Sequence, residues 1–113
     1  MFNFVEMAND YESRKVGRYQ DGPIMVSTAM VNDSKDPYET AIAHPRYNDC
    51  KIIIVETYKS RDSAEIGHER WVNAITTGPL PEKLIDVSSA FSAIICDSLH
   101  SNKDWRIFPL QPE

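Results

Sequence analysis

The sequence predicts an α+β fold, an antiparallel meander sheet of three to five strands with one or two helices packed on one face. Three short β-branched segments, 24–31, 38–44 and 51–58, follow one another with loops of about six residues, too short for a parallel crossover. A segment with helical spacing of apolar residues follows at 60–76. The length of 113 residues suits one unit, so we expect residues 1–113 to form a single domain.

Turn-forming residues separate the three predicted strands. Gly22-Pro23 precedes the first, and a run rich in Asn, Asp and Ser precedes the second. The third strand, 51–58, is apolar on both faces from Ile52 to Val55, whereas a strand with one solvated face alternates apolar and polar residues. Its second face should therefore be covered by another copy of the chain, giving a homo-oligomer and most simply a dimer, or by a second helix.

The first predicted helix, 60–76, has clear ends. Ser60 is a natural N-cap and Gly78-Pro79 stops the helix. One apolar stripe should face the sheet and bury its tryptophan, while Ile66 lies on the opposite face. The stripe consists of Ala64, His68, Trp71, Val72 and Ile75.

The remaining segments are less regular. Apolar residues at intervals of three and four predict a second helix over 82–100, with a strand at Ser92–Cys96 as the alternative. Residues 1–15 suit an N-terminal arm or a short helix. Residues 103–113 suit a C-terminal arm, or an edge strand bounded by prolines.

Composition narrows the class of function. Seventeen acidic against 12 basic residues give a formal charge of −5, which argues against general nucleic-acid binding. The longest apolar run, Ile52 to Val55, is too short to span a membrane, and the first residues lack the pattern of a signal peptide. Two cysteines without a CxxC pattern predict free thiols in a reducing cytoplasm.

Two histidines are secondary site candidates. His44 and His68 could meet in space and bind a metal with Glu39 or Glu56. The simpler interpretation makes His68 a core histidine bonded to a backbone or acidic group, and His44 a strand-end residue that shapes a turn. No catalytic motif is present. We therefore expect no metal, no cofactor and no catalytic residue, which favours a non-enzymatic protein and leaves an enzyme as the alternative.

Two segments combine aromatic and basic residues and are the primary binding candidates. Tyr, Trp and Arg contribute a large share of interface energy. The alternative for the second segment is that its aromatic residues pack on the chain's own sheet. The candidates are Arg46, Tyr47 and Asn48 at a loop tip, with Trp105, Arg106 and Phe108 near the C-terminus.

The middle of the chain, about 38–87, carries a family resemblance. A strand beginning Tyr38-Glu39-Thr40, a strand ending at Tyr58, and the helical run Ala64-Glu65-Ile66-Gly67-His68 are similar to a group of small, uncharacterised bacteriophage proteins. The resemblance implies a phage or prophage origin and supplies no activity or site residues. Gly67 is distinctive because Gly within a helix costs about 1 kcal/mol relative to Ala, which indicates close packing or room for His68.

A weaker similarity is to small dimeric α+β barrel domains, including antibiotic-biosynthesis monooxygenases. Those domains have a helix between their first strands, whereas this sequence predicts an uninterrupted meander over 25–58. The favoured function is a phage accessory protein of the host cytoplasm that binds a host or defence component, either a protein or a small ligand. The alternatives are a phage particle or assembly component, and a small cofactor-free enzyme or nucleotide-signal-binding protein of the dimeric type.

Overall fold

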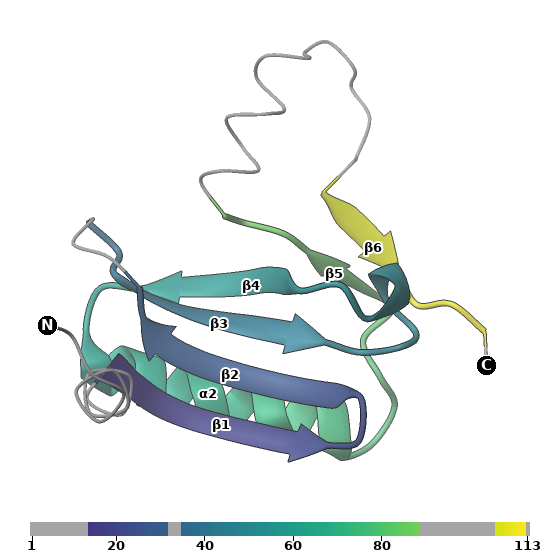
Figure 1. Ribbon diagram of the computed structural model, residues 1–113, viewed down its shortest axis with the longest axis horizontal. Helices are drawn as coiled ribbons and strands as arrows, with labels where there is room; N and C mark the ends of the chain where they lie inside the picture. Colours follow the sequence, from purple (N-terminus) through teal and green to yellow (C-terminus); the bar gives the residue numbers. More distant parts are fainter. Residues whose placement is uncertain (1–13, 32–34, 89–105, 113) are drawn as a thin grey trace, which may run out of the picture.

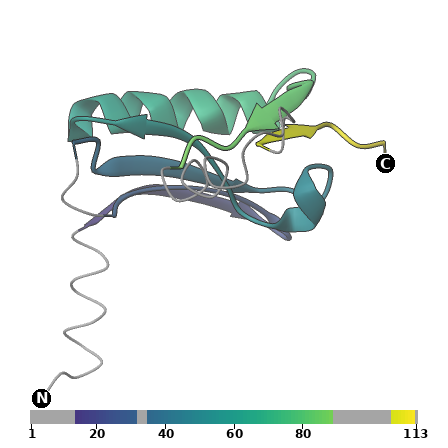
Figure 2. The ribbon, with the colours of Figure 1, turned by 90° about the horizontal axis from the view of Figure 1, so that it is seen from above.

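The computed structural model describes residues 14–31, 35–88 and 106–112. A four-stranded antiparallel sheet with the order β1-β2-β3-β4 has one face covered by a single helix, α2 (Figures 1 and 2). The predicted α+β meander with a helix on one face is confirmed. The elements of this layer pair are β1 (Lys15–Asp21), β2 (Ile24–Met30), β3 (Tyr38–Ala43), β4 (Ile53–Tyr58) and α2 (Arg61–Thr76).

A smaller unit lies beside β4. A short helical turn, η1 (Asn48–Cys50), precedes β4, and β5 (Lys83–Ile85) pairs antiparallel with β6 (Ile107–Pro109). Figure 1 shows this second sheet next to the beginning of β4. No helix in the described ranges is long and apolar enough to cross a membrane.

Strand β1 was not predicted. Its only large apolar residues are Val16 and Tyr19. It is the first strand in the sheet order and pairs with β2 alone, and such an edge strand carries more exposed polar residues than a central one. The Gly22-Pro23 turn was predicted, and it joins β1 to β2 as a two-residue connection in which Gly22 has a φ of +59°. This is a left-handed conformation that glycine adopts without a steric penalty.

The core lies between the sheet and α2. A row of opposed residues, Tyr19, Val26, Ile42 and Ile53, crosses all four strands and faces the helix. The predicted helical stripe is confirmed, except that its tryptophan is half-buried and not buried. Ala64, His68 and Ile75 are buried, Trp71 and Val72 are half-buried, and Ile66 is 69% exposed on the opposite face. The predicted N-cap is also present, since the Ser60 side chain accepts from the Ser63 N–H.

The apolar run before and within β4 is only partly buried. Ile53 and Val55 are buried, but Ile52 precedes the strand and is 58% exposed. The chain after β5 lies along this part of β4, because the Ile54 carbonyl accepts from the Val87 N–H at 2.8 Å. The segment after β5 therefore covers part of the unpaired edge of β4, while closure of the second apolar face by another subunit stays a prediction.

The predicted helix over 82–100 is wrong at its beginning. Residues 83–85 form β5, in which Leu84 is buried opposite Phe108 while Lys83 and Ile85 are exposed. This two-residue period is that of a strand. Residues 89–100, with the alternative strand at 92–96, lie outside the described residues. The same is true of 1–13, so the predicted N-terminal arm is not described.

Candidate functional site

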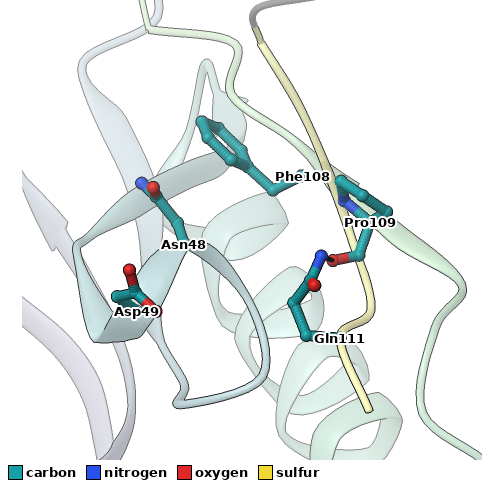
Figure 3. Close-up of a pocket in the computed structure, with 5 residues that line it drawn as sticks. All are labelled: Asn48, Asp49, Phe108, Pro109 and Gln111. Carbon is teal, nitrogen blue, oxygen red and sulfur yellow. Dashed lines mark hydrogen bonds between the residues drawn. The ribbon is translucent and has the colours of Figure 1, made fainter.

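Two of the segments predicted for binding meet in space. The Arg46 Nε donates to the Gln111 carbonyl at 2.7 Å, and the Gln111 N–H donates to the Arg46 carbonyl at 2.8 Å. Beside this contact lies an open, shallow hollow of about 270 Å³, called the tip hollow below. Figure 3 shows residues of the turn and of the C-terminal segment on opposite sides of it. Its lining residues are Asn48, Asp49, Phe108, Pro109 and Gln111.

The turn that carries Asn48 has a left-handed backbone. The φ angles of Asn48, Asp49 and Cys50 are 51°, 52° and 68°. Asn and Asp adopt this conformation more readily than other residues with a Cβ, but Cys does not. Backbone hydrogen bonds hold the turn, since the Cys50 N–H donates to the carbonyls of His44 and Tyr47. Strained turns that the surroundings enforce cluster at functional sites.

The prediction that Tyr47 is an exposed contact residue is wrong. Its side chain is 0% exposed, and its hydroxyl donates to the Pro81 carbonyl in the segment after α2. The His44 and Tyr47 rings meet edge to face, with their centres 5.3 Å apart. Tyr47 therefore anchors the loop tip to the core, and burial raises the pKa of its hydroxyl.

The other candidates, beginning with the secondary candidate His44, lie as follows. His44 shapes the turn as predicted, because its Nδ1 accepts from the Arg46 N–H at 3.1 Å; burial, with a smaller contribution from Arg46, lowers the pKa of His44. Phe108 is half-buried against the core, so this aromatic residue packs on its own chain. Arg106 accepts a hydrogen bond at its carbonyl from the Asp86 N–H, and Trp105 lies outside the described residues.

A second arrangement of polar groups lies under α2 and was not predicted. It is a continuous chain of hydrogen bonds, called the polar chain below. His68 Nδ1 lies 2.7 Å from Thr28 Oγ1, which lies 2.6 Å from Thr40 Oγ1. Thr40 Oγ1 lies 2.9 Å from the Tyr58 hydroxyl, and this hydroxyl donates to Glu56 Oε1 at 3.2 Å. The predicted partner of His68, a backbone or acidic group, is thus replaced by a threonine hydroxyl.

The polar chain ends at a carboxylate with strong donors. Glu56 Oε1 also accepts from Trp71 Nε1 at 2.8 Å and from Arg70. Burial alone would raise the pKa of Glu56, but the hydrogen bonds from Arg70, Trp71 and Tyr58 together hold it below its ordinary value. The Glu56 carboxylate is therefore ionised at neutral pH.

Two glycines make room for the ring side chains of the polar chain. A Cβ on Gly67 would lie 2.3 Å from the Tyr58 ring, and a Cβ on Gly17 would lie 2.6 Å from the His68 ring. Gly67 therefore accommodates Tyr58 rather than its neighbour His68. Thr28 and Thr40, both 0% exposed, carried a signal in the sequence, since they interrupt the inward-facing apolar positions of β2 and β3.

A metal site formed by both histidines finds no support. His44 contacts Arg46 and Tyr47, whereas His68 contacts Thr28. Within 14–31, 35–88 and 106–112, no group of three or more His, Cys, Asp or Glu residues could hold a metal ion. Cys50 is a free thiol.

Comparisons with known proteins give no match among family models, curated proteins or solved structures. The fold and its sites define a small α+β protein with an open hollow of mixed polarity at one end and a buried polar chain under its helix.

Proposed function

We propose that this chain is a phage-encoded accessory protein that acts in the host cytoplasm, without catalysis, by binding a component of the host or of its defences. One observation carries the proposal. Asn48 and Phe108, which belong to two separate candidate segments of the sequence, line the same hollow. The net charge of −5 is compatible with a protein partner. The family resemblance is the ground for the phage origin.

The form of the tip hollow favours a protein partner over a small ligand. Pockets for small molecules enclose most of the ligand surface, whereas this hollow is open and shallow. Phe108 and Pro109 offer an apolar surface, and the side-chain amides of Asn48 and Gln111 can donate to and accept from a peptide backbone. A protruding loop with one apolar side chain fits this combination.

Two matched variants test the proposal. Asn48→Gly keeps the left-handed backbone and removes an amide, and Gln111→Ala removes the other. Tagged wild-type protein and the double variant would be expressed in the bacterial host and purified with their partners. We expect a co-purifying host protein to be lost from the double variant. Gln20→Ala, an exposed glutamine on β1, is the control and should retain it.

The same experiment has a contradicting outcome. Equal recovery of every partner by the double variant, at an unchanged melting temperature, would exclude the tip hollow as the binding surface. Presence of the protein in washed phage particles would instead favour a particle component. The polar chain is the one observation that favours the remaining alternative, a small cofactor-free enzyme or nucleotide-signal-binding protein.

A homo-oligomer, most simply a dimer, is part of the proposal. The exposure of Ile52 beside β4 supports it, because covering a large apolar side chain at an interface lowers the free energy. Sedimentation at low micromolar concentration should give a species heavier than the 12.9 kDa chain. A monomer alone would contradict this part and leave the binding proposal intact.

A further inference from the structure

The hydrogen bonds of the polar chain have one direction. An ionised carboxylate only accepts, and a tyrosine hydroxyl has one proton. The Tyr58 proton is therefore used toward Glu56 Oε1, at 3.2 Å. The opposite orientation would leave two oxygens with lone pairs facing each other at that distance.

This direction propagates through both threonines. Since the Tyr58 proton is used, its oxygen accepts from Thr40, and Thr40 in turn accepts from Thr28. Thr28 then has no proton left for His68, so it accepts from the Nδ1–H of that ring. The network thereby assigns the tautomer of His68. In the neutral ring, the proton is on Nδ1 and Nε2 carries a lone pair.

Nε2 of His68 lies beside the backbone of β1, where a Cβ on Gly17 would come within 2.6 Å of it. His68 is 7% exposed, and its Nε2 has no hydrogen-bond partner among the described residues. Burial lowers the pKa of His68, so the ring is neutral at neutral pH. A hollow of about 360 Å³, nearly as open as the tip hollow and called the His68 hollow below, is lined by Val16, Glu65, His68 and Glu69.

We propose that the His68 hollow binds a primary ammonium or guanidinium group, which donates an N–H to His68 Nε2 and places its charge beside Glu65 and Glu69. Such a cation supplies what the hollow lacks, a donor and a positive charge. Val16 offers an apolar surface for the carbon chain that bears the cation. An anion would be repelled by the two carboxylates, and a neutral donor would leave the charge of Glu69 uncompensated.

Of the two carboxylates of the His68 hollow, one is already paired with a cation of the chain and the other is not. Glu65 already accepts from Arg61 Nε at 3.2 Å, and Arg61 also donates to the Lys15 carbonyl. Glu69 has no ion-pair partner among the described residues. The Glu69 carboxylate should therefore contribute most of the attraction. This site is separate from the tip hollow and does not depend on the proposed function.

The first test is the tautomer itself. Two-bond ¹H–¹⁵N correlation spectra of the full chain at about pH 7.5, above the ordinary histidine pKa, should show a protonated Nδ1 and an unprotonated Nε2 in His68. Thr28→Val removes the acceptor of Nδ1–H and should raise the share of the Nε2–H tautomer. A wild-type ring protonated on Nε2 would overturn the assignment and with it the proposal.

The second test is binding. Agmatine, which carries both an ammonium and a guanidinium group, should shift the His68 Nε2 resonance in a saturable titration. A capped Arg-containing peptide is the second probe, and binding by the peptide alone would place the cation on a partner protein. We expect Glu69→Gln to weaken binding about tenfold, on the order of one charged hydrogen bond. Asp62→Asn, an equal charge change on the same helix outside the hollow, should leave it unchanged.

Three results would overturn the proposal. These are no saturable shift with either probe, equal weakening by Asp62→Asn and Glu69→Gln, and a response to Zn²⁺ without a response to agmatine or peptide. Thr28→Val with unweakened binding would also contradict it, because binding would then not need the lone pair on Nε2.

Discussion

Two regions of the molecule, the layer under α2 and the tip, are each stabilised by a different kind of contact. Under α2, side chains from neighbouring strands form the polar chain, and two glycines let rings pack closely against the backbone. At the tip, three separate segments, 44–50, 81–88 and 106–112, are joined largely by backbone hydrogen bonds, such as Asp86 N–H to the Arg106 carbonyl and Leu110 N–H to the Glu82 carbonyl. The tip also relies on buried side chains, namely Tyr47, His44, Leu84 and Asp86.

The two kinds of contact serve different purposes: one fixes side chains in place, and the other leaves side chains available as a surface. The hydrogen bonds of the polar chain fix one arrangement of its side chains, and they use its three hydroxyl groups but not Nε2 of His68. Backbone hydrogen bonds leave side chains free to form a surface, as Asn48, Asp49 and Gln111 do at the tip hollow. We therefore expect substitutions under α2 to act on stability, and substitutions at the tip to act on stability only where they remove its anchor.

The largest effect is expected at that anchor. Tyr47→Ala should destabilise the fold by about 3–5 kcal/mol, because it empties a fully buried ring site. Tyr47→Phe keeps the ring and leaves the Pro81 carbonyl without its donor, which should cost about 1–3 kcal/mol. Urea denaturation measures both. A loss below about 1 kcal/mol in Tyr47→Ala would show that the tip does not depend on this ring.

Gly67→Ala should be the next largest. Helix propensity alone would make Ala more stable by about 1 kcal/mol, but the new methyl group would meet the Tyr58 ring. We expect a net loss of about 1–3 kcal/mol, as for overpacked cores. Asn73→Ala, on the exposed face of the same helix, is the control and should be neutral or slightly stabilising. Stabilisation by both variants would refute the close contact.

A smaller effect of opposite sign is expected in the left-handed turn. Cys50 has a φ of 68°, which costs a residue with a Cβ about 1–2 kcal/mol relative to its preferred conformation. Cys50→Gly removes this cost and adds freedom to the unfolded chain, so a gain of about 0.5–1 kcal/mol should remain. Thermal denaturation under reducing conditions measures it. Cys50→Ala keeps the Cβ and should show no gain.

The smallest effect is a change in pH dependence. The pKa of His68 is lowered from 6.5 by burial, so the unfolded chain takes up its proton first as the pH falls. Stability is therefore fully present above about pH 6.5 and declines below it. The variant His68→Gln should decline less between about pH 7.5 and 5, although His44, whose pKa is also lowered, contributes in both proteins. Parallel curves would mean that His68 is not buried in its neutral form.

The sequence predicted what depends on local pattern. The segments β2, β3, β4 and α2 lie close to their expected bounds, because their apolar periods and turn residues are strong. The edge strand β1 was missed because its exposed polar residues hide the strand pattern. Strand β5 was mistaken for a helix because Leu84 and Val87 are also three positions apart, and only pairing with β6 decides between the two periods.

The candidate sites were predicted less well, because their residues come together only through contacts between segments that are distant in the sequence. Asn48 and Phe108 were named, but their meeting depends on strand pairing between distant segments. Tyr47 was misplaced because a loop-tip aromatic has the same local pattern whether it faces solvent or the core. The roles of Thr28 and Thr40 appear only when β2 and β3 are aligned in register.

The one-directional polar chain also connects the Arg70–Glu56 ion pair with the buried His68 ring. Each of its three hydroxyls has a single proton, so reversing one without the others leaves two protons, or none, between a pair of oxygens. The chain thus has two complete arrangements, one with Glu56 ionised and the reverse one with Glu56 protonated. Arg70 favours the first because it lowers the pKa of Glu56, and this end of the chain thereby selects the tautomer of His68 at the other end. Replacing Arg70 by a neutral residue would therefore be felt at a ring nitrogen that it does not touch.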